Sequence, residues 1–241
     1  MTIHWLLIRA SSLPDEDDWL GPEERKVVAR LKLPKRRSEW LLGRFVAKHA
    51  LASLADIDSL DRIQIIAAED GAPDAFIDGE PIVSSISISH REDAAACAIA
   101  PHTKVGCDLE AVEPRTSRFV NDFFTEGERA AVQRQPDAVR DRHIALTWSA
   151  KESALKVLRV GLRRDTRCVE VEIEDPETME TGWHLLSATV SPENRRLNGW
   201  WRHDEGVVLT VVCDEAPGER RPRPVEVQHG RKTERSRGKS Q

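Results

Sequence analysis

The segment from Trp148 to Lys156, WSAKESALK, constrains the fold most, because it places charged side chains where a helix needs apolar ones. Positions i, i+3, i+4 and i+7 form one face of an α-helix, and here they hold Trp148, Lys151, Glu152 and Leu155. Moving an ion from water into a protein interior costs on the order of several kcal/mol unless an opposite charge, a metal or a phosphate compensates. We therefore expect this helix to carry part of a functional site.

Hydrophobic periodicity predicts a chain that mixes helices and strands. Apolar spacing and capping residues predict helices over 22–33, 35–54, 126–133 and 142–158. Period-two patterns and β-branched runs predict strands over 3–8, 62–67, 85–89, 94–100, 104–110, 169–173, 183–190 and 207–213. Within 85–89 serine and isoleucine alternate, so Ile86 and Ile88 should face one side and Ser87 and Ser89 the other. No internal repeat is visible in the sequence.

Composition indicates a soluble protein. The 241 residues are 39% hydrophobic and 32% charged, and no apolar run approaches the roughly 20 residues of a membrane helix. The first residues lack the basic leader of a secretory signal, so we expect a cytoplasmic location. Four widely spaced cysteines without a CxxC pair favour buried free thiols over zinc or disulfide sites: Cys97, Cys107, Cys168 and Cys213.

The net charge of -5 is unevenly distributed along the chain. Residues 215–241 carry eight lysines and arginines against four glutamates, with several prolines and glycines and few large apolar residues, so we expect a basic, disordered tail. The body before this tail is strongly acidic, which makes nucleic acid an unlikely partner for it. Solvation is the simpler role for the tail, and contact with RNA or an acidic partner is the alternative.

Three carboxylates suggest a magnesium site. Asp108 and Glu110 lie two residues apart on a predicted strand, so both leave the same face with Cα atoms roughly 7 Å apart. Glu152 adds a third carboxylate from a helix, and hard oxygen donors without a supporting His or Cys favour magnesium over zinc. Magnesium usually completes its shell with water and substrate phosphates. The set therefore predicts a diphosphate ligand and phosphoryl transfer, with Lys151, Lys156, His90 and basic residues of helix 35–54 nearby.

Each element of this set also has a purely structural explanation. An Asp-x-Glu on a strand is most often a solvated edge, and Glu152 with Lys156 is an i, i+4 pair found on many exposed helices. A histidine such as His90 at a strand end is more often a hydrogen-bonded structural residue. These explanations do not account for the two ions within the apolar stripe of the helix.

The ordered motifs resemble those of the surfactin-type phosphopantetheinyl transferases. The resemblance spans 22 to about 161 and rests on PEERKVVARLKLPKRRSEWLLGRFVAKHAL, SISISH, KVGCDLEAV, FFTEGE and WSAKESALK, in that order. It implies an α+β fold of two similar, pseudo-twofold halves, each a small antiparallel sheet packed with a long helix, with a ligand cleft between them. We expect halves at 1–102 and 103–214, followed by the tail at 215–241.

The resemblance also implies an activity and a set of roles. The protein would transfer 4'-phosphopantetheine from coenzyme A to a serine of an apo acyl or peptidyl carrier protein, as a magnesium-dependent monomer. Asp108, Glu110 and Glu152 would bind Mg²⁺, with Glu152 also the general base and Lys156 acting in catalysis. The residues that would hold the coenzyme A phosphates are Arg36, Arg44, Ser89, His90, Lys151 and Lys156.

Two positions depart from the family pattern. Where members often carry a basic residue in a Gly-basic-Pro turn, this chain has Ala72, and a basic position of the first helix is Val27. Lys26 and Arg30 are near enough in sequence to substitute for the latter. These changes bear on coenzyme A affinity rather than on the reaction type.

Two other classes of function remain open from sequence. One is a binding protein that has lost catalysis and uses its basic tail, although the complete carboxylate set argues against it. The other is a magnesium phosphodiesterase acting on nucleic acid, which the acidic body disfavours. Arg118, Phe119, Phe123 and Phe124 form a basic and aromatic sequence patch that could meet a carrier, although core packing is the favoured role for most of these aromatics.

Overall fold

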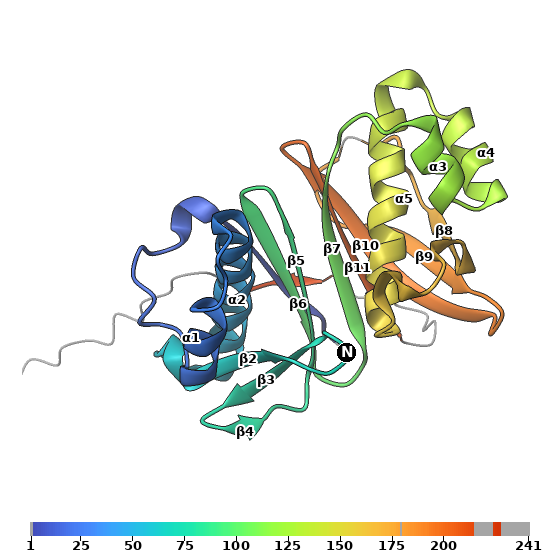
Figure 1. Ribbon diagram of the computed structural model, residues 1–241. Coiled ribbons are helices and arrows are strands. Elements are labelled where there is room, and N and C mark those ends of the chain that lie inside the picture. Colours follow the sequence, from blue (N-terminus) through green and yellow to red (C-terminus); the bar gives the residue numbers. More distant parts are fainter. Residues whose placement is uncertain (1, 179, 215–223, 228–241) are drawn as a thin grey trace, which may run out of the picture.

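The computed structural model describes residues 2–178, 180–214 and 224–227, and these residues adopt the predicted α+β fold (Figure 1). The helices are α1 (Pro22–Val28), α2 (Pro34–Ala55), α3 (Ser117–Phe123), α4 (Glu126–Arg134) and α5 (Asp137–Val157). The strands are β1 (His4–Arg9), β2 (Ile63–Ala67), β3 (Pro73–Ile77), β4 (Glu80–Pro81), β5 (Ser85–Arg91), β6 (Ala94–Ala100), β7 (Val105–Ala111), β8 (Val169–Ile173), β9 (His184–Val190), β10 (Arg195–Asp204), β11 (Val207–Cys213) and β12 (Val225–Glu226).

Helix α2 packs on a four-stranded sheet with the order β12-β1-β6-β5. The apolar stripe of α2 is buried, and Leu42, Phe45 and Val46 join Leu6 and Cys97 of the sheet in one core. Beside this sheet, β2, β3 and β4 form a small antiparallel sheet that also contacts α2. The alternation predicted for 85–89 is confirmed, since its isoleucines pack with the α2 core.

Helix α5 packs on a five-stranded antiparallel sheet with the order β7-β11-β10-β9-β8. It lies closest to β7 at Gly106, where a Cβ atom would stand only 2.0 Å from the backbone oxygen of Ser153. Only glycine allows this approach, which sets the carboxylate-bearing strand directly against the carboxylate-bearing helix. Figure 1 shows α2 and α5 on opposite sides of the molecule with the two sheets between them.

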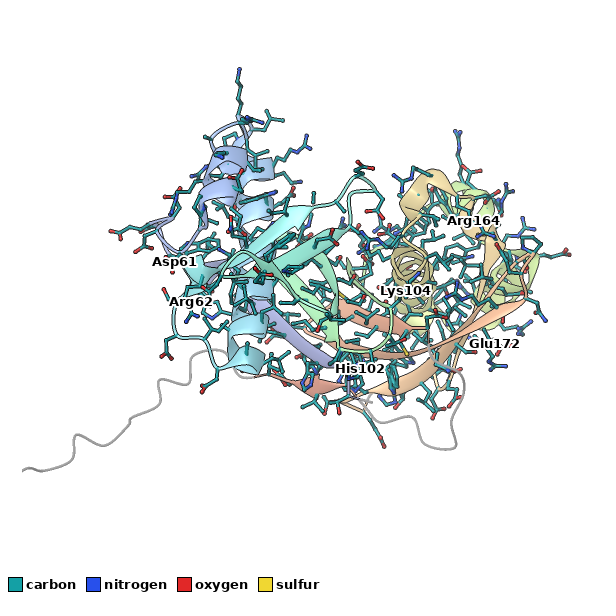
Figure 2. The ribbon with its side chains drawn as sticks, turned by 90° about the horizontal axis from the view of Figure 1, so that it is seen from below. Asp61, Arg62, His102, Lys104, Arg164 and Glu172 are labelled. Carbon is teal, nitrogen blue, oxygen red and sulfur yellow. The ribbon has the colours of Figure 1, made fainter. Side chains whose placement is uncertain are left out.

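A third core joins the two sheets. It is formed by the small side chains of β6 together with large aromatic ones, among them Trp5, Trp183 and Trp200. The guanidinium of Arg202 lies 4.7 Å from the centre of the Trp5 ring. This cation–π contact stabilises the positive charge of Arg202 beside the apolar cluster. Figure 2 shows His102 and Lys104, which precede β7, between the part built on α2 and the part built on α5. The division at 102–103 stays a prediction.

Several element bounds differ from those predicted. The first helix ends at Val28 instead of residue 33, and the site helix begins at Asp137, five residues before the predicted start. Strands β3, β4, β10 and β12 were not predicted from the pattern.

The prediction of a disordered tail over 215–241 is wrong for the short stretch 224–227. There β12 pairs with β1 in parallel, the backbone N–H of Val225 donates to Ile3 at 2.8 Å, and Val227 is buried in the α2 core. The rest of that tail lies outside the described residues. In the described part of the chain, every helix is too short or too polar to cross a lipid bilayer.

Candidate functional site

The three predicted carboxylates come together where α5 crosses β7. Asp108 is 2% exposed, whereas Glu110 and Glu152 are partly exposed. Oδ1 of Asp108 accepts hydrogen bonds from Ser89 Oγ and Lys156 Nζ, both at 2.8 Å. Oδ2 of the same carboxylate is buried and has no hydrogen-bond donor among the described residues. One buried oxygen of the group is therefore available to a further cation or proton.

The raised pKa values of Glu152 and Glu110 show that nearby cations compensate the negative charges of the three carboxylates only in part. Burial raises the pKa of Glu152 to about 7, and the neighbouring carboxylate of Asp108 adds to this effect. Burial and Asp108 likewise raise the pKa of Glu110, against the opposing effect of Arg91 and Arg115. Burial would lower the pKa of Lys156, but Asp108, Cys107 and Glu152 together outweigh it and the pKa is raised, so Lys156 remains an ammonium ion.

The three carboxylates are suitable ligands for a hard divalent cation, although the described residues do not form a complete coordination sphere. Within the described ranges, no group of three or more His, Cys, Asp or Glu side chains is arranged to hold a metal ion. Glu110 turns its Oε2 toward Arg115 Nη2 at 3.1 Å and toward Arg91 at 3.8 Å. Magnesium, however, seldom uses an all-protein cage and completes its shell with water and phosphate. The unpartnered Asp108 Oδ2 and the mutually repelling carboxylates match that mode of binding.

A pocket of about 320 Å³ is lined from both sides of the molecule, and Lys156, which bonds to Asp108, is one of its lining residues. The turn 70–74 and β5 form one wall, and Lys104, Lys156 and Arg159 contribute positive charge from the other. Lys104 and Arg159 were not identified as site residues from the sequence: Lys104 begins the KVGCDLEAV motif but had no role assigned to it, and Arg159 follows the WSAKESALK motif. Only the folding of β7 and of the chain after α5 brings them to the pocket.

A second pocket, of about 530 Å³, collects three of the predicted phosphate ligands: Arg36, Arg44 and His90. Arg36 and Arg44 come from α2 and His90 from the end of β5. The guanidinium of Arg44 lies 4.7 Å from the centre of the Trp40 ring and donates to Ile65 O at 2.9 Å, while His90 Nε2 lies 3.5 Å from Glu39 Oε2. The structure thus brings these residues together, and their phosphate contacts stay a prediction.

Lys151 lies in a different environment from the one expected. Its ammonium is fully buried, 2.8 Å from Glu128 Oε2 and within hydrogen-bond distance of the Thr166 and Val169 carbonyls. It therefore faces away from both pockets. Ser89 is also buried, and its hydroxyl accepts from Leu109 N at 3.2 Å while donating to Asp108. Neither side chain is placed to hold a phosphate in this structure.

The Lys151–Glu128 pair has a counterpart in the first half of the chain, between Lys48 and Glu24. Both glutamates occupy the third position of a short helix and accept from the backbone N–H that precedes it. The second oxygen of Glu24 accepts from Ile65 N, and that of Glu128 from Val171 N. The same arrangement, a buried lysine paired with a helix-capping glutamate, therefore occurs twice. Neither glutamate was assigned this role from the sequence.

Charged residues lie close to both positions that depart from the family pattern, Ala72 and Val27. The turn containing Ala72 also contains Asp70, whose carboxylate binds Arg159 at two points, 2.6 Å and 3.0 Å. A guanidinium from the far side of the pocket therefore stands beside this turn. Val27 is 40% exposed, and the adjacent Lys26 pairs with Glu23 at 2.6 Å.

The aromatic sequence patch is mostly core, as favoured. Phe124 is 1% exposed and packs with Val132, Ile144 and Trp148, with Phe119 against them. Phe123 retains 36% exposure, and its ring centre lies 5.0 Å from that of Trp148.

Three neighbouring carboxylates, one of them bonded to a lysine that lines a pocket, form a site suited to a phosphate-bearing ligand and a hard cation. Comparison with known proteins defines the family. Residues 23–100 match the 4'-phosphopantetheinyl transferase N-terminal domain, and residues 104–212 match the 4'-phosphopantetheinyl transferase superfamily. The chain belongs to the 4'-phosphopantetheinyl transferase family.

Characterised relatives are similar at low identity. An L-aminoadipate-semialdehyde dehydrogenase-phosphopantetheinyl transferase of Xenopus laevis is 25% identical over 75% of this chain and 65% of its own length. The 4'-phosphopantetheinyl transferase AcpT of Escherichia coli is 32% identical over 50% of this chain and 57% of its own. HetI of Nostoc, a 4'-phosphopantetheinyl transferase, is 24% identical over 73% of this chain and 76% of its own. The chain thus spans less than two thirds of the first two relatives.

Proposed function

We propose that this protein transfers the 4'-phosphopantetheine group from coenzyme A to a serine of an apo acyl or peptidyl carrier protein, releasing adenosine 3',5'-bisphosphate. The observation that carries the proposal is the meeting of Asp108, Glu110 and Glu152 within a chain of this family. The surfactin-type arrangement, with two pseudo-twofold halves and the ligand between them, is part of the proposal. The repeated Lys–Glu pairs support it.

Asp108, Glu110 and Glu152 would hold Mg²⁺, which when bound would neutralise the diphosphate and the leaving oxygen. Basic side chains that line the two pockets would hold the nucleotide: Arg36, Arg44 and His90 at one, and Lys156 with Lys104 and Arg159 at the other. Lys156, kept charged by Asp108, would also stabilise charge that develops during transfer. In this proposal Lys151 supports the helix and Ser89 supports Asp108, and neither binds phosphate.

Glu152 would be the general base for the serine hydroxyl of the carrier. Without a bound cation, burial and the neighbouring Asp108 raise the pKa of Glu152 to about 7, so this carboxylate gains by taking up a proton or a cation. The serine oxygen would attack the phosphorus that bears pantetheine, its proton would pass to Glu152 directly or through water, and the bond to the bisphosphate would break.

Replacing Glu152 tests this assignment. Glu152→Gln removes the base and one cation ligand with little change of shape, so the rate of adenosine 3',5'-bisphosphate release should fall by roughly 100-fold or more. The exposed Glu80→Gln on β4 is the matched control and should keep the wild-type rate. Full activity in Glu152→Gln would refute both roles of this residue.

A location in the cytoplasm, expected from the first residues of the sequence, and a monomeric state, implied by the family resemblance, remain predictions. The alternative of a tail-driven binding protein concerns residues that lie mostly outside the described ranges. A magnesium phosphodiesterase would need a surface for a nucleic acid backbone, and the acidic body disfavours it.

A further inference from the structure

Strands β5 and β7 meet through serine hydroxyls. Each is the end strand of its sheet, so one row of its backbone groups faces away from its own sheet. Along β7, the N–H groups of Val105, Cys107 and Leu109 point toward β5. They donate to the hydroxyls of Ser85, Ser87 and Ser89 at 3.0 Å, 2.9 Å and 3.2 Å. The alternating serines therefore close the seam between the two sheets.

Ser89 differs from the other two serines, because its hydroxyl also donates to Asp108 Oδ1 at 2.8 Å. It therefore holds the side chain of residue 108 and the backbone of residue 109 at once. Lys156 donates to the same Oδ1, so both donors engage one oxygen. The buried Oδ2 receives no nitrogen or hydroxyl donor among the described residues, and the neighbouring Glu152 can share a proton with this carboxylate. An aspartate held only by Lys156, whose side chain is 29% exposed, would be free to turn.

We propose that Ser89 is a positioning residue that aims Oδ2 of Asp108 at the divalent cation. This inference rests on the proposed function, since it assumes that a cation binds at the three carboxylates. In this inference Ser89 acts by orienting Asp108 and does not bind a phosphate. Its single hydroxyl proton is donated to the carboxylate of Asp108, and its side chain is only 6% exposed. Partners of metal ligands typically change metal affinity by 10–100-fold when they are removed.

Direct cation binding tests the inference. Mn²⁺ stands in for Mg²⁺ and is titrated into the full-length protein with coenzyme A present, while free Mn²⁺ is followed by electron paramagnetic resonance. Ser89→Ala should weaken Mn²⁺ binding roughly 10-fold. Ser85→Ala removes an equivalent seam hydroxyl without a carboxylate contact. Because Ser85 lines the first pocket, its coenzyme A affinity is measured as well, and at saturating coenzyme A its Mn²⁺ affinity should stay within about two-fold of wild type.

A second pair of variants keeps the test decisive if Ser89→Ala does not fold. Ser89→Cys preserves the shape with a much weaker donor and should lose affinity, whereas Ser89→Thr keeps the hydroxyl and should retain it. Wild-type affinity in Ser89→Ala or Ser89→Cys would overturn the inference alone, as would an equal loss in Ser85→Ala. A wild-type protein that binds no Mn²⁺ beyond that bound by coenzyme A would overturn the metal site itself, and the inference with it.

Discussion

Single side chains in this protein show how burial sets charge. Asp108 is buried yet receives an ammonium and a hydroxyl on one oxygen, so its charge is compensated only in part. Glu152 receives less compensation, and its pKa rises to about 7. Buried carboxylates cost free energy unless a cation joins them. These destabilising carboxylates lie where the proposed reaction needs a cation and a base.

His143 on α5 is predicted to make folding sensitive to acid. Burial lowers its pKa from 6.5 to about 4, with a further contribution from Arg134. In the unfolded chain the histidine binds a proton first as pH falls, so the free energy of unfolding should decrease as pH falls from 6.5 toward 4. The loss between pH 7 and pH 5 should be roughly 2 kcal/mol at most.

Urea unfolding of wild type and His143→Gln at the two pH values measures this effect. The variant should lose less stability between them, whereas replacing the exposed His102 should leave the difference unchanged. An identical pH response in wild type and His143→Gln would mean that His143 is not the group responsible.

At the scale of elements, a short helix is joined to a long one twice by a buried ion pair. Glu24 ties α1 to Lys48 of α2, and Glu128 ties α4 to Lys151 of α5. Each glutamate also bonds to backbone N–H groups, and each lysine to backbone carbonyls. Such saturation is what allows two ions to remain in an interior. The helix that carries Glu152 is thereby anchored one residue away.

Breaking one member of the pair should be costly. Lys151→Met leaves the Glu128 carboxylate buried without its cation, and the free energy of unfolding should fall by about 3–5 kcal/mol. The double variant Lys151→Met with Glu128→Gln should lose considerably less, because no ion is left unpaired. Lys48→Met is the matched comparison and should resemble Lys151→Met. A loss below about 1 kcal/mol in urea unfolding of Lys151→Met would contradict this account.

Strong patterns in the sequence predicted most of the elements, and weak ones were missed for physical reasons. The strands at 94–100, 169–173 and 207–213 are confirmed, because their apolar runs are bounded by polar residues. Strand β10 was missed because RRLNGWWRHD begins with arginines and contains Asn and Gly, which disfavour strands until neighbouring strands pair with them. The charged stripe of α5 drew attention to Glu152, which the structure places beside Asp108 and Glu110, but periodicity could not separate Lys151 from Lys156. Which ammonium is buried depends on Glu128, a contact across 23 residues of chain.

The whole molecule depends on contacts between its two larger sheets. The aromatic core around Trp5 and Trp200 and the serine seam of β5 and β7 hold them together, and the carboxylates lie beside that seam. Strand β12 adds a further link, since it follows the second sheet in sequence but pairs with β1 of the first. Both sheets therefore contribute residues to the site, and hydrogen bonds between β5 and β7 hold these residues in place.

Removing β12 should weaken the molecule. A chain ending at Asp214 loses the buried Val227 and the backbone hydrogen bonds to Ile3 and Trp5, a loss of roughly 2 kcal/mol. Compared with a chain ending at Val227, its melting temperature should be lower by about 4–8 °C in differential scanning calorimetry. Equal melting temperatures for the two chains would show that β12 contributes nothing to stability.

The mass of an apo carrier protein, measured after incubation with this protein, coenzyme A and Mg²⁺, tests the central claim most directly. The account predicts a carrier heavier by one phosphopantetheine group on a single serine, with no gain when EDTA replaces Mg²⁺ or when that serine is alanine. Unchanged mass across a panel of acyl and peptidyl carriers, with folded protein and free Mg²⁺ present, would contradict it.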